Sequence, residues 1–163
     1  MNWMIRLASR KDVPQIAALH NRFLQDRSFI QKRVPSICEC STITIRVKDI
    51  EKSILQEMKD PAYTHVVAID QEKVVGYLVL IEIEEMDDLL KPPYSSIDTI
   101  EIHPDYQNKG LGQVLMDEAI RIAKEKHHYY IDLNVWVFND PAIHLYSKNG
   151  FIPIEQRMAK KLQ

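Results

Sequence analysis

Cysteine is nearly absent: the 163 residues contain two, Cys38 and Cys40, one residue apart. A disulfide between them would close a strained, tiny loop, and no second Cys or His pair completes a zinc site at the usual spacing. We therefore interpret both as reduced thiols, and we expect no disulfide framework and no bound metal.

Long apolar runs and an excess of one charge are also missing. The longest apolar run, residues 74–81, is too short to cross a bilayer, and residues 1–6 lead into no apolar core with a cleavage site. We expect no membrane partner and a cytoplasmic location. The net charge of -2 disfavours nucleic acid as a partner. A composition of 45% hydrophobic and 27% charged residues is typical of a globular protein, and we expect one domain over residues 1–163.

Glycine is scarce as well, with four residues, yet two of them fall together at Gly110 and Gly112. They lie in a turn, residues 107–112, between a strand-like run and a helix-like run. The first N–H groups of a helix lack internal partners and its dipole makes that end positive, so the turn predicts a phosphate site. Without side chains at the glycines, a pyrophosphate can approach the backbone closely. No Gly-Lys-Ser/Thr follows, which excludes a P-loop, and Leu115 occupies the place of the third glycine of a dinucleotide site.

The spacing of apolar residues predicts an α/β fold, with a central mixed β-sheet flanked by helices on both faces. Residues 130–138 lack clean alternation, which is typical of a strand buried on both faces. Residues 27–44 are poorly patterned, 84–96 are interpreted as a polar loop, and 151–162 as one or two last strands. The other predicted strands are residues 3–7, 65–69, 74–83 and 97–102, and the predicted helices are 13–24, 47–58, 111–126 and 141–149.

Two blocks in this order resemble the GNAT N-acetyltransferase superfamily. The first is Ile-Glu-Ile-His-Pro-Asp-Tyr-Gln-Asn-Lys-Gly-Leu-Gly over residues 100–112, a strand followed by the glycine turn. The second is Asn139, followed by a helix that ends in Tyr-Ser-Lys-Asn-Gly-Phe over residues 146–151. The resemblance covers about residues 97–151, and it implies a GNAT-like fold with acetyl-CoA as the co-substrate.

The resemblance also implies roles for single residues. In the family the pyrophosphate lies on the backbone of the turn and the pantetheine arm adds to the strand before it like an extra strand. A further Asn lies near the pantetheine, and a Tyr lies near the thioester sulfur. These roles map onto Asn108, Lys109, Gly110, Leu111, Gly112 and Gln113 for the pyrophosphate, Ile100, Glu101 and Ile102 for the arm, Asn139 for the Asn, and Tyr146 for the catalytic Tyr.

The implied reaction is direct attack of a primary amine on the thioester, and it raises two proton problems. Deprotonating an alkyl amine at pH 7 costs about 4.6 kcal/mol, so a base or a water chain is expected to help. Some relatives carry a Glu on the strand before the Asn, but here the corresponding residue is Asn134, which cannot act as a base. Water held by main-chain carbonyls, Asp98 and Glu101 stay open as the base, and Glu101 is alternatively a strand residue that faces solvent.

The departing coenzyme A thiolate needs a proton, and a phenol can donate one. Tyr146 fits this role by its place in the second block; alternatively, its ring only packs in the core. The implied function is an N-acetyltransferase acting on a small-molecule or peptide amine, and the alternative is a non-catalytic acyl-CoA-binding sensor or regulatory module. The acceptor, the use of other acyl groups and the choice between a monomer and a homodimer stay open.

Overall fold

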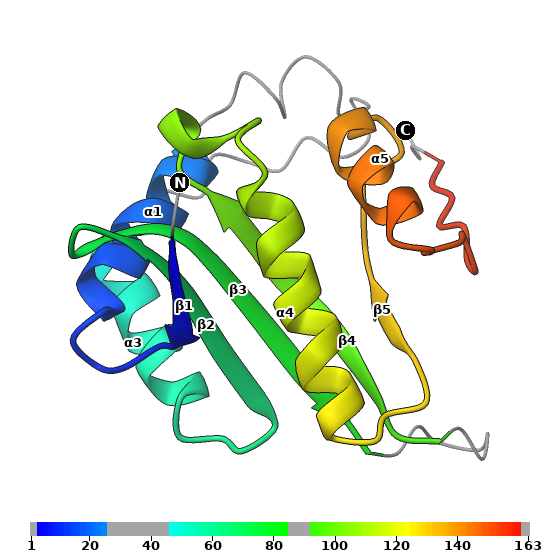
Figure 1. Cartoon of the computed structure of the whole chain (residues 1–163), viewed down its shortest axis with the longest axis horizontal. Helices are drawn as coiled ribbons and strands as arrows, with labels where there is room; N and C mark the ends of the chain where they lie inside the picture. The colour runs from blue at the N-terminus through cyan, green and yellow to red at the C-terminus, as the bar shows by residue number, and fades with distance from the viewer. Residues whose placement is uncertain (1–2, 26–45, 85–91, 161–163) are drawn as a thin grey trace.

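The protein is described by a computed structural model that covers residues 3–25, 46–84 and 92–160. Its strands form one sheet in sequential order, β1-β2-β3-β4-β5 (Figure 1). Neighbouring strands are antiparallel from β1 to β4, whereas β5 runs parallel to β4. The predicted mixed sheet is therefore confirmed. The strands are β1 Met4–Leu7, β2 Tyr63–Asp70, β3 Lys73–Ile83, β4 Tyr94–Ile102 and β5 Ile131–Leu133.

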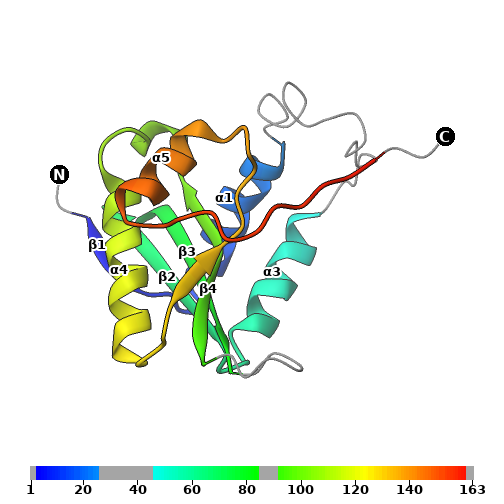
Figure 2. The same ribbon diagram turned by 90° about the vertical axis from the view of Figure 1, so that its right-hand side faces the viewer.

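Helices cover both faces of the sheet, as predicted. Figure 2 shows α4 and α5 on one side of the strands and α1 and α3 on the other. A short 3-10 helix, η2, links β4 to the turn before α4. The helices are α1 Val13–Gln25, α3 Val47–Glu57, η2 Pro104–Tyr106, α4 Leu111–Glu125 and α5 Asp140–Lys148.

The central strand β3 separates two apolar cores. Its Leu78 and Leu80 face the α4 side, where the helical stripe that includes Leu115 and Met116 is fully buried. Its Val79 belongs to the core on the other face, under α1 and α3. Burying each such side chain stabilises the folded state by roughly 1.5–3 kcal/mol. The helices are therefore held mainly by their packing on the sheet, and less by their intrinsic helix propensity.

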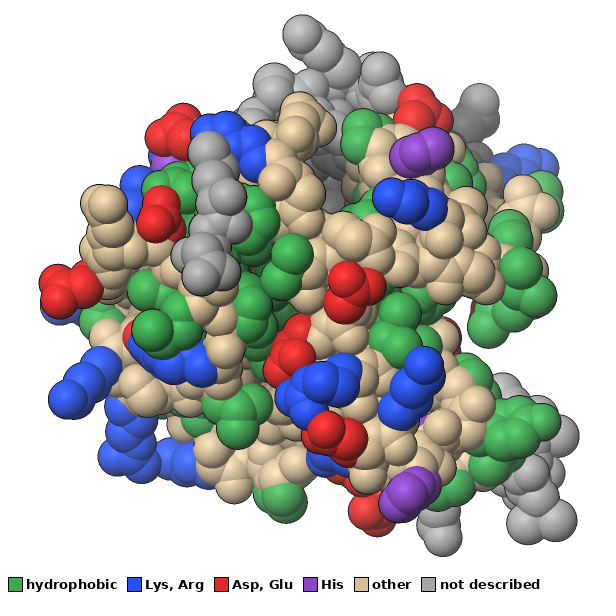
Figure 3. Space-filling view, viewed as in Figure 1, with side chains coloured by type: hydrophobic (Ala, Val, Ile, Leu, Met, Phe, Trp, Pro, Cys, Tyr) green, Lys and Arg blue, Asp and Glu red, His purple; other side chains and the backbone are tan. Residues whose placement is uncertain are grey.

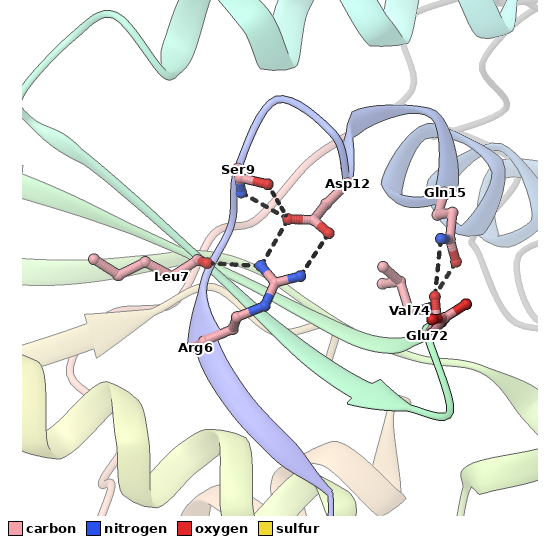
Figure 4. A network of polar contacts seen from close by, with 7 residues as sticks. All are labelled: Arg6, Leu7, Ser9, Asp12, Gln15, Glu72 and Val74. Atoms are coloured by element: carbon pink, nitrogen blue, oxygen red, sulfur yellow. Dashed lines mark hydrogen bonds and ion pairs between the residues drawn. The ribbon is translucent and has the colours of Figure 1, made fainter.

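The first helix is tied to the sheet by a cluster of polar contacts at its start (Figure 4). Asp12 accepts two hydrogen bonds of 2.8 Å from the guanidinium of Arg6 on β1, and it also accepts from the backbone N–H and hydroxyl of Ser9. One turn further on, Gln15 Nε2 donates to the Glu72 carbonyl, and its Oε1 accepts from the N–H of Val74, both at the β2–β3 hairpin. The Asp12 carboxylate is buried and fully bonded, so its charge holds the start of α1 against β1, while the amide of Gln15 holds the helix against the β2–β3 hairpin.

We expect Asp12→Asn to lower the free energy of unfolding by about 1–3 kcal/mol at neutral pH, the range for losing a hydrogen-bonded charge. The hydrogen bonds from Arg6 hold the pKa of Asp12 well below its ordinary value. Because the folded-state pKa is depressed, this stabilisation is present above the unfolded pKa of about 3.9 and is lost as the pH falls further. Urea unfolding at pH 7 and near pH 2 measures the difference.

The matched control is Glu125→Gln, which removes an exposed carboxylate that pairs with Arg121. A surface pair of this kind contributes at most about 1 kcal/mol. Equal effects of the two substitutions at pH 7 would contradict the structural role of Asp12.

Strand β4 begins three residues earlier than predicted. The sequence interpretation placed a polar loop over 84–96, broken by two prolines, but Tyr94, Ser95 and Ser96 pair with β3. Ser95 is buried, and its hydroxyl lies 2.7 Å from Nδ1 of His128. The buried serine therefore has a polar partner, which a polarity pattern alone does not reveal.

The prediction of a long, fully buried strand over 130–138 was wrong. Strand β5 is limited to Ile131–Leu133 and is half-buried, because β4 is its one partner in the described sheet. Trp136 and Val137 beyond it are exposed. The predicted last strands are also absent from residues 151–160, where the chain leaves the sheet and Ile152 and Ile154 are exposed (Figure 2). Alternating apolar residues form a strand only where a neighbouring edge can pair with them.

Figure 3 shows acidic and basic side chains interspersed over α4, where Arg121 pairs with Glu118 and Glu125. The expectation that the chain does not bind nucleic acid is untested and stays a prediction. None of the described helices has the length and apolar character that crossing a bilayer requires. The cysteines at 38 and 40 lie outside the described residues.

Candidate functional site

Among the described residues, the edge of β4 that faces β5 is unpaired along half of its length. Pairing between the two parallel strands ends at Ile97 and Leu133, whereas β4 continues to Ile102. At the same point β4 carries a bulge: Leu80 pairs with Ile97 and Val79 with Thr99, so that Asp98 is the extra residue. A bulge bends its strand and ends regular pairing. An extended chain with amide groups can therefore add to this edge.

The three residues predicted to hold the pantetheine arm, Ile100, Glu101 and Ile102, all lie on this open stretch. The side chains of Ile100 and Ile102 pack toward the α4 core, so their backbones are the groups that remain for a ligand. The carbonyl of Ile102 already accepts a hydrogen bond of 3.2 Å from Gln107 Nε2.

The glycine turn connects this edge to the start of α4. Asn108 and Gly110 have positive φ angles of 57° and 88°, and Gly110 is the residue before the helix. The N–H groups of Gln113 and Val114 donate to the Gly110 carbonyl. Those of Leu111 and Gly112, the first helical residues, have no acceptor among the residues that the structure describes. An ideal Cβ at Gly110 would meet no atom of the described residues within 4 Å, so the space beside Gly110, at the start of the helix, is open.

Glycine is required at the two positions of the turn for different physical reasons. A Cβ at Gly112 would lie 3.2 Å from both Ile102 and Leu145, so this glycine allows α4 to pack closely against β4 and α5. The sequence interpretation assigned it only to the approach of a pyrophosphate. The side chains of Lys109 and Gln113 already contact other residues, so their backbone groups are the ones that remain for a ligand. Lys109 Nζ lies 5.5 Å from the centroid of the Tyr106 ring, and Gln113 Nε2 donates to Asp117 and Asn149.

The residues of the second block lie on α5. Asn139 is the helix cap, and its side chain accepts from the N–H of Ala142 at 3.4 Å. The Tyr146 ring is buried, with its centroid 5.9 Å from that of Phe151. Its hydroxyl has no hydrogen-bond partner in the described part of the chain, and burial raises its pKa. A phenol in this state stays protonated at neutral pH and is free to donate.

A cleft on the opposite face of the sheet, which we call the α1–α3 cleft, has a volume of about 340 Å³. Its walls come from α1, α3, β3 and β4, and no Lys or Arg is among the described residues that line it. It carries the carboxylates of Asp49, Glu57 and Asp98. The cleft is lined by His20, Leu24, Asp49, Ile50, Ser53, Ile54, Glu57, Tyr77, Val79, Asp98 and Thr99.

Glu101 does not face solvent, which corrects one of the two interpretations of this residue. Its side chain is 4% exposed, and Oε1 lies 2.6 Å from Nδ1 of His20 on α1. The other oxygen, Oε2, is buried without a hydrogen-bond partner among the described residues. His20 was not among the predicted site residues, because nothing in the predicted helix over residues 13–24 distinguishes it from the other positions of a helical stripe. Ile-Glu-Ile is also the ordinary alternation of a strand with one face in solvent, so no local signal indicated that Glu101 has a buried partner.

Within residues 3–25, 46–84 and 92–160, no three His, Cys, Asp or Glu side chains converge in a way that would hold a metal ion. The expectation that no metal takes part stays a prediction.

Comparison with known proteins gives a consistent result. A model of the acetyltransferase (GNAT) family matches residues 34–151. A Bacillus subtilis (strain 168) protein, provisionally named a ribosomal protein bS18-alanine N-acetyltransferase, is 31% identical over 139 residues, which are 84% of this chain and 82% of that protein.

Two solved structures have similar folds. One is a ribosomal-protein-alanine N-acetyltransferase from Brucella melitensis biovar Abortus 2308, with a TM-score of 0.70 and 18% identity over 99% of this chain and 100% of that chain. The other is an aminoglycoside N-acetyltransferase in complex with CoA, with a TM-score of 0.76 and 10% identity over 99% of this chain and 95% of that chain. The match to the family model over more than half of the sequence, together with the fold, shows that this chain belongs to the GNAT family of N-acetyltransferases.

Proposed function

We propose that this chain, as one domain over residues 1–163, transfers the acetyl group of acetyl-CoA to a primary amine, which is an ammonium ion in solution and attacks the thioester directly in its neutral form. One observation carries the proposal. The open stretch of β4 leads at one end, through η2, to the glycine turn, and at the other end its Asp98 and Thr99 line the α1–α3 cleft. A single strand therefore connects a place for a phosphate with a place for an amine.

The co-substrate side of this proposal rests on groups that the fold leaves unpaired. The pyrophosphate would be held by the backbone of the turn from Asn108 to Gln113, where the N–H groups of Leu111 and Gly112 and the positive helix end lie next to the open space beside Gly110. The amides of the pantetheine arm would pair with the edge of β4 at Ile100, Glu101 and Ile102. Asn139, which caps α5, would contact the arm from the other side. When bound, the thioester supplies an activated acetyl group.

Tyr146 is the proposed general acid. The reaction leaves a thiolate, and a buried phenol that makes no other hydrogen bond can donate its proton to it. Burial favours the neutral form of the hydroxyl, so the donor is fully protonated at physiological pH.

The acceptor side is supported by the charge of the α1–α3 cleft. An ammonium group that leaves water needs opposite charge nearby. Glu57 and Asp98 supply it, whereas the Asp49 carboxylate is already paired with Arg46 at 2.9 Å. The similar proteins named above act on amines, the alanine of a ribosomal protein and an aminoglycoside. An N-terminal peptide amine and a polyamine or aminoglycoside are therefore the first acceptors to test.

We expect coenzyme A to raise the melting temperature of the chain. At a free concentration one hundredfold above Kd, a ligand that binds only the folded state adds about 2.7 kcal/mol. For a domain of this size that corresponds to about 5–11 °C. Differential scanning fluorimetry with coenzyme A measures the shift, and adenosine alone is the control. No shift at millimolar coenzyme A would contradict the assignment of the co-substrate.

Turnover distinguishes the enzyme from a sensor. Thiol release from acetyl-CoA, measured against an alanyl peptide, a polyamine and an aminoglycoside, is expected for at least one amine and not for the same compound after N-acetylation. Tight binding of coenzyme A without turnover of any amine would support a regulatory acyl-CoA-binding module instead.

A further inference from the structure

A buried hydrogen-bonded pair joins the two sides of the proposed site. His20 lies in the last turns of α1, and Glu101 lies 81 residues later on the open stretch of β4. The distance between Nδ1 of His20 and Oε1 of Glu101 is 2.6 Å. The Glu101 side chain is 4% exposed, whereas that of His20 is 30% exposed, so the pair extends from the interior toward the α1–α3 cleft.

The geometry of the pair fixes which nitrogen of His20 is free. A carboxylate only accepts hydrogen bonds, so Nδ1 carries the proton that is shared with Glu101. In the neutral ring Nε2 then has the lone pair. Nε2 has no hydrogen-bond partner among the described residues, and the His20 ring lines the same cleft as Asp98 and Thr99 of β4. His20 thus presents a proton acceptor to the space assigned to the amine.

We propose that His20 accepts the proton which the acceptor amine loses on attack, and that Glu101 is a positioning residue that orients the His20 ring and stabilises its protonated form. This proposal rests on the proposed function. His20 thereby takes the place of water, Asp98 and Glu101, the three bases that the sequence left open.

Two groups of this chain, His20 and Tyr146, account for both proton transfers of the acetyl transfer. The lone pair of the neutral amine forms the N–C bond to the thioester carbonyl carbon, and the amine proton passes to Nε2 of His20. The C–S bond then breaks, the sulfur keeps the electron pair, and the thiolate takes a proton from the Tyr146 hydroxyl. Exchange with water returns both residues to their starting states.

The charges around His20 support its proposed role, because they stabilise the protonated ring. The hydrogen bond with Glu101 raises the pKa of His20 against the opposing effect of its burial, and Glu57 and Asp98 raise it further. Asp49 on α3 and the neutral Tyr77 on β3 also line the cleft. The cation nearest in sequence, Arg22, is engaged 3.1 Å from Nε2 of His103. Because the pKa of His20 lies above its ordinary value, the base is lost by protonation at a higher pH than a free imidazole would be.

The pH dependence of kcat/KM separates a base from a structural pair. We choose an alanyl peptide as the probe, because its α-amine titrates near pH 7.7–8.0. On the acid side, log kcat/KM of the wild type is expected to fall with a slope of about 2, since both the amine and His20 must be deprotonated. For His20→Gln the slope is expected to be about 1 and the plateau to fall roughly 10²-fold. The matched control is His144→Gln, an exposed histidine on α5, with the wild-type profile.

Two further variants keep the test decisive if His20→Gln folds poorly. Glu101→Gln preserves the shape of the positioning residue and removes its charge, so the pKa of His20 seen in the profile should move down and the plateau should drop. Added imidazole should restore part of the rate of His20→Ala and none of the rate of Glu101→Gln, which keeps its own ring in place.

The outcomes assign failure to one proposal or the other. An active wild type together with an unchanged slope and plateau in His20→Gln overturns the role of His20 alone. A wild type that turns over neither the alanyl peptide nor any polyamine or aminoglycoside overturns the proposed function, and this role with it.

Discussion

Replacing Tyr146 by phenylalanine is expected to lower the turnover number roughly 10²-fold, the usual range for losing a general acid. The substitution removes only the hydroxyl, and the ring still fills its place in the core beside Phe151. The melting temperature and the affinity for coenzyme A should therefore change little. Steady-state kinetics with acetyl-CoA and the best amine, together with a thermal melt, measure the three quantities.

The chemistry of the leaving group sharpens this test. A thioester whose thiol is more acidic needs less help from an acid, so the loss caused by Tyr146→Phe should shrink with such a donor. Tyr129→Phe is the matched control, because Tyr129 is 80% exposed and lies outside the proposed site. If Tyr146→Phe retains wild-type turnover on a substrate whose chemical step limits the rate, Tyr146 is a packing residue.

The second large effect is expected at the glycine turn, where Gly110→Asp should weaken the binding of coenzyme A by roughly 10–100-fold, or about 1.4–2.7 kcal/mol. The new carboxylate would lie in the open space beside Gly110, at the start of the helix, where it competes with the pyrophosphate for the positive helix end. Isothermal titration with coenzyme A measures the loss.

Two variants separate charge from backbone strain. Gly110 has a φ of 88°, so any side chain there costs roughly 1–2 kcal/mol of stability. Gly110→Asn adds a side chain of the same shape without the charge and should bind more tightly than Gly110→Asp. Gly150 has a φ of 85° and equally open surroundings, so Gly150→Asp should cost similar stability and leave the affinity unchanged. Equal affinities of Gly110→Asp and Gly150→Asp would show that the turn is not the phosphate site.

The sequence predicted those parts of the protein whose cause is local. The glycine turn, the helix after it and the helix capped by Asn139 each follow from residues within a few positions of one another. The runs that form β2 and β3 were also predicted from their own residues, whereas the positive φ angles of Gln71 and Glu72 in the turn between them have no local signal, because such turns favour Gly, Asn and Asp. Two short motifs in the right order were then enough to indicate the family.

The parts that depend on distant residues were missed or mistaken. His20 and Glu101 are separated by 81 positions, and no pattern in either segment indicates that they meet. One or two last strands were predicted over residues 151–162, but a strand needs a neighbouring edge to pair with, and Ile152 and Ile154 are exposed. Ser95 was assigned to a loop because its polarity was visible and its partner His128 was not.

The bulge at Asp98 has a consequence for insertions and deletions in this strand. Ile97, Ile100 and Ile102 all face the α4 core although their numbers are not all odd or all even, since Asp98 shifts the alternation by one position. A regular strand through Asp98 would have turned Glu101 into that core and Ile100 toward His20. Deleting Asp98 would leave every later side chain on its present face while removing the kink that parts β4 from β5. The presence of this one residue thus decides whether β4 pairs with β5 along its whole length or leaves part of its edge for a ligand.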